Sequence, residues 1–138
     1  MKLLLAILLL LPSLAFANPY DWKVTRVIDG DTVEVKVSFL PIELGDKLSI
    51  RIGGVDTPEK GFRAKCVSEK LLGEQATTFT KNFVKSAKSV RINITEWDKY
   101  GGRVIGDIIV DGKSLKNELI TRGYAVPYNG GTKGSWCK

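Results

Sequence analysis

Residues 27–35, Val27-Ile-Asp-Gly-Asp-Thr-Val-Glu-Val35, place two aspartates around one glycine, directly before a run with strand periodicity. In this run, which continues to Phe39, apolar and polar side chains alternate, as is typical of a β-strand with one buried face. Asp-Gly is an ordinary turn sequence, so the stretch predicts two strands, residues 22–29 and 31–40, joined by a turn. Turn chemistry alone explains the two aspartates, and metal binding is the alternative.

Outward from this stretch, the same two periodicities divide the rest of the chain into strands and helices. Ser68 is a predicted helix N-cap, and Gly123 ends the last helix. The further predicted elements are strands at 48–52, 90–94 and 103–110 and helices at 68–87 and 114–122. This order predicts a mainly β fold with helices, a five-stranded OB-fold Greek-key barrel with two packed helices.

The first 17 residues have the composition of an export signal. Met1-Lys2 is a short positive region, nine apolar residues follow from Leu3 to Leu11, and Ala15-Phe16-Ala17 fits a signal peptidase site. The apolar run is shorter than the roughly 20 residues that span a bilayer, so it predicts no stable membrane anchor. We expect a cleavable signal peptide, residues 1–17, and a single exported domain, residues 18–138, in a periplasm or secreted.

The charge balance is basic, with 21 Lys and Arg against 15 Asp and Glu, a net charge of +6. A small basic protein suits nucleic acid or anionic lipid as a partner. The cations are dispersed along the chain, however, as on many solvated surfaces. Charge alone therefore does not select a partner.

The chain has two cysteines, Cys66 and Cys137. In an exported protein a disulfide is the expected state, and it would tie the C-terminus to the middle of the chain. Two free thiols are the alternative. Only the distance and orientation of the two cysteines in the folded chain decide between the disulfide and the free thiols. Metal binding by two cysteines is disfavoured in a chain without histidine.

The absence of histidine excludes every mechanism that needs imidazole as an acid, a base or a ligand. Carboxylates, arginines and a bound cation remain. Acidic residues stand at three junctions between elements, namely Asp29 with Asp31, Asp56 with Glu59, and Asp98. If the second and third strands pair, Asp31 and Asp56 converge at one mouth of the barrel, where carboxylates, a carbonyl and waters suit Ca²⁺.

Two arginines favour a functional interpretation of these carboxylates. Arg51 lies on the face of its strand opposite the apolar residues, and Arg103 begins the strand 103–110. Beside a cation–carboxylate site, two guanidiniums form a phosphate clamp, because their forked donors match phosphate oxygens. A solvated surface position is the commoner fate of any single arginine.

The order of the motifs carries a resemblance. Over residues 24–125 the sequence resembles the staphylococcal nuclease (thermonuclease) family in VIDGDTV, the arginine of the third strand, VDTPE, DKYGGR and DGKSLKNELITRGYA. The resemblance implies a Ca²⁺-dependent endonuclease with an OB fold. Such an enzyme hydrolyses phosphodiester bonds of DNA and RNA with low sequence specificity and leaves 3′-phosphate ends. We expect it to act as a monomer.

The resemblance also implies roles for individual residues. Asp31 and Asp56 resemble the carboxylate ligands of Ca²⁺, and Thr57 matches a ligand that acts through its backbone carbonyl. Glu59 resembles the residue that orients or deprotonates the attacking water. The remaining matches are the arginines on the scissile phosphate, Arg51 and Arg103, and the positions that line the nucleotide pocket, Lys99, Tyr100 and Tyr128.

The sequence departs from the family pattern in three places. The turn between the second and third strands is longer than in the best-known member, and DKYGGR has one extra glycine before Arg103. The long C-terminal helix of that member, the third helix of the fold, is absent. The chain ends instead in PYNGGTKGSWCK. We expect a Cys66–Cys137 bond to replace part of the docking role of that helix.

Two other functions compete with the exported nuclease. A noncatalytic OB module that binds nucleic acid needs basic and aromatic residues, but it does not need the five-residue set Asp31, Asp56, Glu59, Arg51 and Arg103. A secreted structural domain with acidic turns predicts no effect of Ca²⁺ on thermal stability. The presence of all five residues favours the enzyme.

Overall fold

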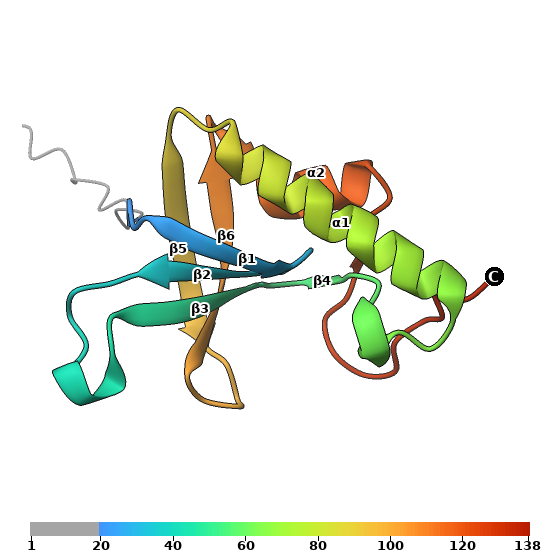
Figure 1. The fold of residues 1–138 in the computed structure, drawn as a ribbon, viewed down its shortest axis with the longest axis horizontal. Coiled ribbons are helices and arrows are strands. Elements are labelled where there is room, and N and C mark those ends of the chain that lie inside the picture. Colours follow the sequence, from blue (N-terminus) through green and yellow to red (C-terminus); the bar gives the residue numbers. More distant parts are fainter. Residues whose placement is uncertain (1–19) are drawn as a thin grey trace, which may run out of the picture.

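The computed structural model describes residues 20–138 (Figure 1), so the predicted signal peptide lies outside the described residues. The main elements are β1 (Val24–Asp29), β2 (Thr32–Lys36), β3 (Lys47–Ile52), α1 (Val67–Lys85), β5 (Val90–Trp97), β6 (Arg103–Val110) and α2 (Leu115–Thr121). Short elements between them are η1 (Ile42–Leu44), β4 (Val55–Asp56), η2 (Gly61–Arg63), β7 (Lys113–Ser114) and β8 (Val126–Pro127). No helix within residues 20–138 has both the length and the apolar character to cross a membrane.

The strands of the main sheet follow the order β1-β2-β3-β6-β5. Neighbours are antiparallel except for β3 and β6, which are parallel. Tyr20, just before β1, forms a bridge to Ile92 of β5, with N···O distances of 2.9 and 2.6 Å, so the two edges of the sheet meet there (Figure 1). This order, together with two helices, confirms the predicted mainly β fold of the OB type.

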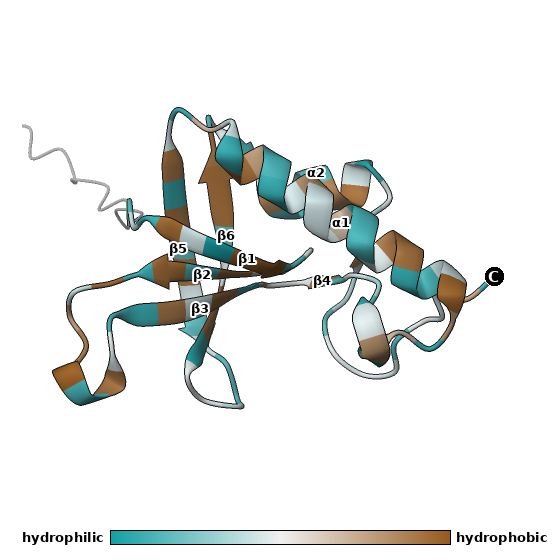
Figure 2. Cartoon of the chain, viewed as in Figure 1, coloured by the Kyte–Doolittle hydropathy of each residue, from teal (hydrophilic) through white to brown (hydrophobic). Residues whose placement is uncertain are grey.

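The alternation that predicted the strands also builds the core (Figure 2). Inward-facing residues of the strands and of α2 are fully buried, and the largest of them are Ile50, Ile52, Ile92, Ile108, Leu115 and Leu119. Complete burial of one such side chain contributes about 1.5–3 kcal/mol, so the pairing register of these strands is strongly specified. Arg51 is held on the opposite face from Ile50 and Ile52 by this register, as its position in the alternation predicts.

Helix α1 packs over the turn between β1 and β2 (Figure 1). The Thr80 hydroxyl donates a 2.7 Å hydrogen bond to the carbonyl of Gly30. A Cβ at Gly30 would lie 2.9 Å from the Cβ of Ala76, so only glycine allows this approach. The glycine of the Asp-Gly-Asp motif therefore lets the helix press on the turn that carries Asp29 and Asp31.

The prediction that Ser68 caps α1 is wrong, because Cys66 is the N-cap. The backbone of Cys66 is extended, and its sulfur accepts the Glu69 N–H at 3.4 Å, as a capping group does. Ser68 lies in the first turn, where its hydroxyl contacts the Cys66 sulfur at 3.2 Å and accepts the Lys138 N–H at 3.3 Å. The first turn of α1 thus meets the C-terminal tail.

Strand boundaries differ from the predicted ones where turns compete with periodicity. The predicted strand 31–40 ends at Lys36, because Pro41 and η1 turn the chain away. Strand β5 continues past residue 94 to Trp97 through a register shift between Ile94 and Glu96. Within residues 20–138 the chain forms no third α-helix, as expected from PYNGGTKGSWCK.

Candidate active site

A cleft of about 510 Å³ lies where the β1–β2 turn, the end of β3, the β5–β6 hairpin and the C-terminal tail meet. Its lining includes seven of the nine predicted site residues, namely Asp31, Arg51, Glu59, Lys99, Tyr100, Arg103 and Tyr128. Two predicted ligands, Asp56 and Thr57, are not on its open wall, and both are buried. The strands and turns thus gather most of the predicted residues around one space.

Arg51 and Asp31 form an ion pair at the end of the β2–β3 ladder. Arg51 stands opposite Thr32 in this ladder, so the register places its guanidinium beside the carboxylate of the preceding residue. The same guanidinium donates to the Val55 carbonyl at 3.2 Å. The Thr57 hydroxyl donates to Asp31 at 2.8 Å, which brings the VDTPE loop against the Asp-Gly-Asp turn.

Burial of Asp31 opposes the ionised form of its carboxyl group. Burial raises the pKa of Asp31 to about 7; Arg51 works in the opposite direction, and the Asp29 carboxyl nearby adds to the rise. A bound cation offsets the cost of ionising a buried carboxylate. The site therefore suits more positive charge than Arg51 supplies alone.

Arg103, on the strand that pairs with β3, is held in the cleft by Asp98. The guanidinium contacts the Asp98 carboxylate at 2.7 Å through Nε and at 2.6 Å through the terminal nitrogen. Burial acts to raise the pKa of Asp98, but the Tyr100 N–H and Arg103 outweigh it and hold that pKa below its ordinary value. The sequence predicts Asp98 only as an acidic residue at a junction between two elements. In the structure its contacts fix the direction of the Arg103 side chain.

Aromatic and cationic groups line the entrance next to this pair. The ammonium of Lys99 lies 5.1 Å from the ring centre of Tyr100, and the Arg103 guanidinium lies 5.9 Å from it. The extra glycine of DKYGGR is accommodated in the β5–β6 turn, where Gly101 and Gly102 both have positive φ. Tyr100 is exposed, so its ring is available to stack on a base.

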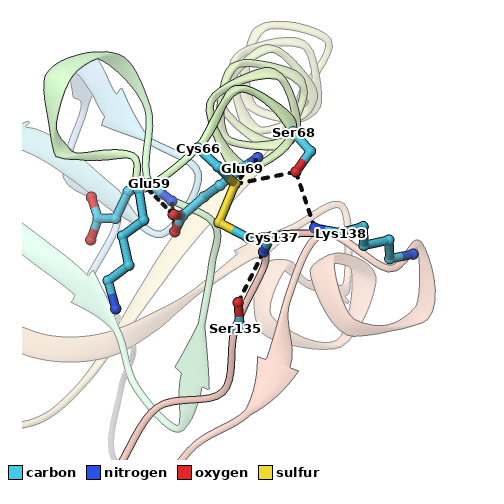
Figure 3. The surroundings of a disulfide bond; sticks show 8 residues. Glu59, Cys66, Ser68, Glu69, Ser135, Cys137 and Lys138 are labelled. Carbon is cyan, nitrogen blue, oxygen red and sulfur yellow. Dashed lines mark hydrogen bonds between the residues drawn. A yellow bond between two sulfur atoms is a disulfide. The ribbon is translucent and has the colours of Figure 1, made fainter.

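Glu59 lies on a loop that is fixed from behind. Its carboxylate pairs with Arg63 at 3.2 Å, and Arg63 also reaches Asp29 at 3.0 Å. The buried carboxylate of Glu69 accepts the Glu59 N–H at 3.2 Å and the Lys65 N–H at 2.7 Å (Figure 3). The loop is therefore held by α1, while the Glu59 carboxylate faces the cleft.

Cys66 and Cys137 form a disulfide with a Cα–Cα distance of 5.9 Å (Figure 3). It joins the start of α1 to the C-terminal tail. Glu69 lies close to both sulfurs, but disulfide sulfurs lack the thiolate character that metal binding needs. The bond is therefore a structural link.

Both oxygens of the Asp56 carboxylate are contacted by the tail. Lys133 places its ammonium 2.8 Å from Oδ1, and the Trp136 indole N–H donates to Oδ2 at 3.0 Å. Burial acts to lower the pKa of Lys133, but the Asp56 carboxylate outweighs it and raises that pKa above its ordinary value. These two tail residues were not predicted, because an irregular glycine-rich segment has no periodicity that places its side chains.

Asp29 also belongs to the cleft, although the sequence suggested only a turn role for it. It lines the space beside Asp31, and its Oδ1 is the one buried side-chain oxygen or nitrogen among residues 20–138 that has no hydrogen-bond partner. Buried polar atoms of this kind call for a partner. Its place two residues before Asp31, on the far side of one glycine, was the available signal.

The donor set fits a hard divalent cation. Carboxylate oxygens are the ligands that Ca²⁺ prefers. Asp31 and the unpartnered Oδ1 of Asp29 line the cleft, and Thr57, whose hydroxyl donates to Asp31, directly follows Asp56 in the chain. The Lys133 ammonium already forms an ion pair with Asp56. Residues and charge are therefore suited to such an ion at this place.

Comparison with known proteins agrees with the geometry. The family model described as staphylococcal nuclease homologue matches residues 49–134. Endonuclease YncB of Bacillus subtilis is 37% identical over 103 residues, 72% of this chain and 44% of that protein. The thermonuclease of Staphylococcus hyicus is 35% identical over 112 residues, 80% of this chain and 60% of that protein.

An uncharacterized endonuclease of Escherichia coli is 30% identical over 107 residues, 77% of this chain and 60% of that protein. The matched part of the chain thus spans 44% to 60% of the length of these three relatives. The family match and these relatives agree with a mainly β fold that gathers arginines and carboxylates around one cleft. The chain belongs to the staphylococcal nuclease family.

Proposed function

We propose that the protein is an exported, Ca²⁺-dependent endonuclease that hydrolyses DNA and RNA with low sequence specificity and leaves 3′-phosphate ends. The observation that carries this proposal is the convergence of Arg51, Arg103 and Glu59 on one cleft beside buried Asp31. Family membership and relatives named as endonucleases or thermonuclease support the activity.

In this proposal each side chain has a chemical task. Asp31, Asp56 and the Thr57 carbonyl would hold Ca²⁺, which supplies a Lewis acid for a phosphoryl oxygen. Glu59 accepts a proton from the attacking water, a task for which a chain without histidine has carboxylates. Arg51 and Arg103 neutralise the charge that builds on the equatorial phosphate oxygens.

Low specificity follows from what the cleft offers to a nucleotide. Tyr100 and Tyr128 present aromatic faces, and Lys99 adds charge, so a strand is held by stacking and by its backbone. Neither kind of contact distinguishes one base from another strongly, and neither requires or excludes a 2′-hydroxyl. This supports tolerance of both DNA and RNA.

Cleavage of end-labelled single-stranded DNA and RNA tests the activity, with Ca²⁺, Mg²⁺ or chelator. We expect Glu59→Gln to lower the Ca²⁺-dependent rate by about 10²–10⁴-fold and Arg51→Ala by about 10²–10³-fold. Glu43→Gln in η1 and Arg91→Ala on β5 are matched controls, because both residues are exposed and neither lines the cleft. Products should resist primer extension until a phosphatase removes the 3′-phosphate.

The principal rival is a noncatalytic OB module that binds nucleic acid. If the protein binds both substrates but cleaves neither under any of the three conditions, the noncatalytic module is the correct function and the proposed nuclease activity is wrong. Export is tested separately by the mass of the protein recovered outside the cytoplasm. Removal of the predicted signal peptide gives a chain that begins at Asn18.

A further inference from the structure

The C-terminal tail reaches the cation site along a fixed path. The Tyr128 N–H donates to the Gly54 carbonyl at 2.9 Å, and β8 pairs with β4, which contains Asp56. Nine residues after Tyr128, the disulfide holds Cys137 at the start of α1. Trp136 directly precedes this cysteine, so the covalent link places the indole beside Asp56.

The two tail groups on Asp56 differ in how easily they can leave. Trp136 is partly buried and donates a neutral N–H to Oδ2, and losing this bond would leave a buried oxygen without a donor. The Lys133 side chain is 44% exposed, carries a full charge on a flexible stem, and needs only to turn into solvent. A second cation arriving at Oδ1 repels the ammonium but does not repel the indole.

We infer that the tail is a working part of the cation site: Trp136 orients the Asp56 carboxylate, and Lys133 is a counter-ion that a bound divalent cation displaces. This inference rests on the proposed function, in which Asp56 is a ligand. Trp136 is a positioning residue, because it acts through Asp56. Its N–H holds one oxygen so that the other points at the ion, as outer-shell donors do for metal ligands.

The inference predicts opposite effects for the two residues on Ca²⁺ affinity, measured by calorimetry on the full chain. Lys133→Met removes the competing ammonium, so the dissociation constant should fall by about 2- to 5-fold, as expected for a partly exposed ion pair. Trp136→Phe removes the N–H and keeps the ring, so the constant should rise by at least about 10-fold. A merely structural tail would weaken binding in both variants.

Matched controls separate these effects from charge and packing. Lys138→Met removes a cation from the same tail, and the Lys138 ammonium forms no ion pair with any carboxylate of residues 20–138. Trp22→Phe removes an indole from the stack with Tyr20, which is not part of the cleft. Both controls should bind Ca²⁺ like the parent protein.

Terbium luminescence gives an independent readout, with Tb³⁺ as the probe and indole excitation. An indole one hydrogen bond from a ligand should sensitise the bound ion strongly, so the emission should disappear in Trp136→Phe and persist in Trp22→Phe. Persistent emission in Trp136→Phe would overturn the inference. So would unchanged or weaker Ca²⁺ binding in Lys133→Met.

The failure of this inference can be told apart from the failure of the proposed function. If the parent protein binds Ca²⁺, loses it in Asp31→Asn, and the two tail variants bind it like the parent, the tail inference is wrong and the cation site stands. If the parent protein binds no Ca²⁺, both fail. Nuclease activity enters neither measurement.

Discussion

The cleft has two walls that the chain builds in different ways. One wall, called the strand wall, contains the ion pair of Asp31 and Arg51. These two residues lie at the ends of the paired strands β2 and β3, whose register is set by buried valines and isoleucines. The tail wall pairs Asp56 with Lys133 and Trp136, and the indole lies 80 residues farther along the chain. The first wall inherits its geometry from the core, whereas the second depends on one covalent link and a few polar contacts.

This difference teaches that the two carboxylates expected to share a cation are secured independently. Loss of the tail leaves the strand register intact, because the core residues of β2 and β3 do not contact the tail through any pairing. Loss of core packing would disturb both walls. The following changes break or sharpen the comparison.

The largest expected effect comes from breaking the disulfide. Cys66→Ser with Cys137→Ser opens a loop of 71 residues in sequence separation, for which the loop-entropy model gives about 4 kcal/mol of lost stability. Urea unfolding measures this free energy, and calorimetry on the same variant should show weaker Ca²⁺ binding. Reduction of the parent protein is the control. A loss below about 1 kcal/mol with unchanged Ca²⁺ affinity would show that the tail wall stands without the bond.

The pH dependence of stability sharpens the strand wall. Burial raises the pKa of Asp31 from 3.8 to about 7 in the folded protein. Between about pH 4 and 7 the metal-free folded protein therefore binds more protons at Asp31 than the unfolded chain does. The stability contributed by Asp31 is therefore fully present below about pH 4 and is lost as the pH rises through 7. The slope is at most about 1.4 kcal/mol per pH unit.

Asp31→Asn should remove this slope, measured by urea unfolding in chelator between pH 4 and 8. Asp46→Asn is a suitable control, because that carboxylate is exposed and lies in the turn before β3. Equal slopes in Asp31→Asn and in the parent protein would show that Asp31 is not the titrating group.

A smaller effect is expected where α1 supports the Glu59 loop between the two walls. At Gly73 an added Cβ would lie 2.4 Å from the Glu59 carbonyl oxygen, so Gly73→Ala must displace this loop. Overpacking of this kind costs about 1–3 kcal/mol, and the nuclease rate should fall because Glu59 moves. Gly134→Ala has open space around its Cβ and is the control. An unchanged melting temperature and rate in Gly73→Ala would contradict the support of the Glu59 loop by α1.

Much of the strand wall could be predicted because local patterns specify it. Alternation over residues 33–37 and 48–52 settles which side chains are buried, and the position of Arg51 on the other face follows from a period of two. Burial of the valines and isoleucines then selects the register. Asp31 and Arg51 meet because both lie at the ends of these paired strands.

The N-cap of α1 and the occupants of Asp56 could not be read from the same patterns. Ser68 is a better capping residue than cysteine by intrinsic preference, but the disulfide and the tail engage the first turn, and Cys66 takes the cap position. Lys133 and Trp136 lie in a segment without periodicity, so nothing local places them.

From the amino-acid sequence alone, the order of the main strands and helices, the face of β3 that carries Arg51 and the absence of any imidazole chemistry were determined, because each depends on residue type and on short periodic spacing. The folded chain decided which groups touch the carboxylates. Those contacts join residues up to 80 positions apart, and only the packing of α1, the path of the tail and the Cys66–Cys137 bond bring them together.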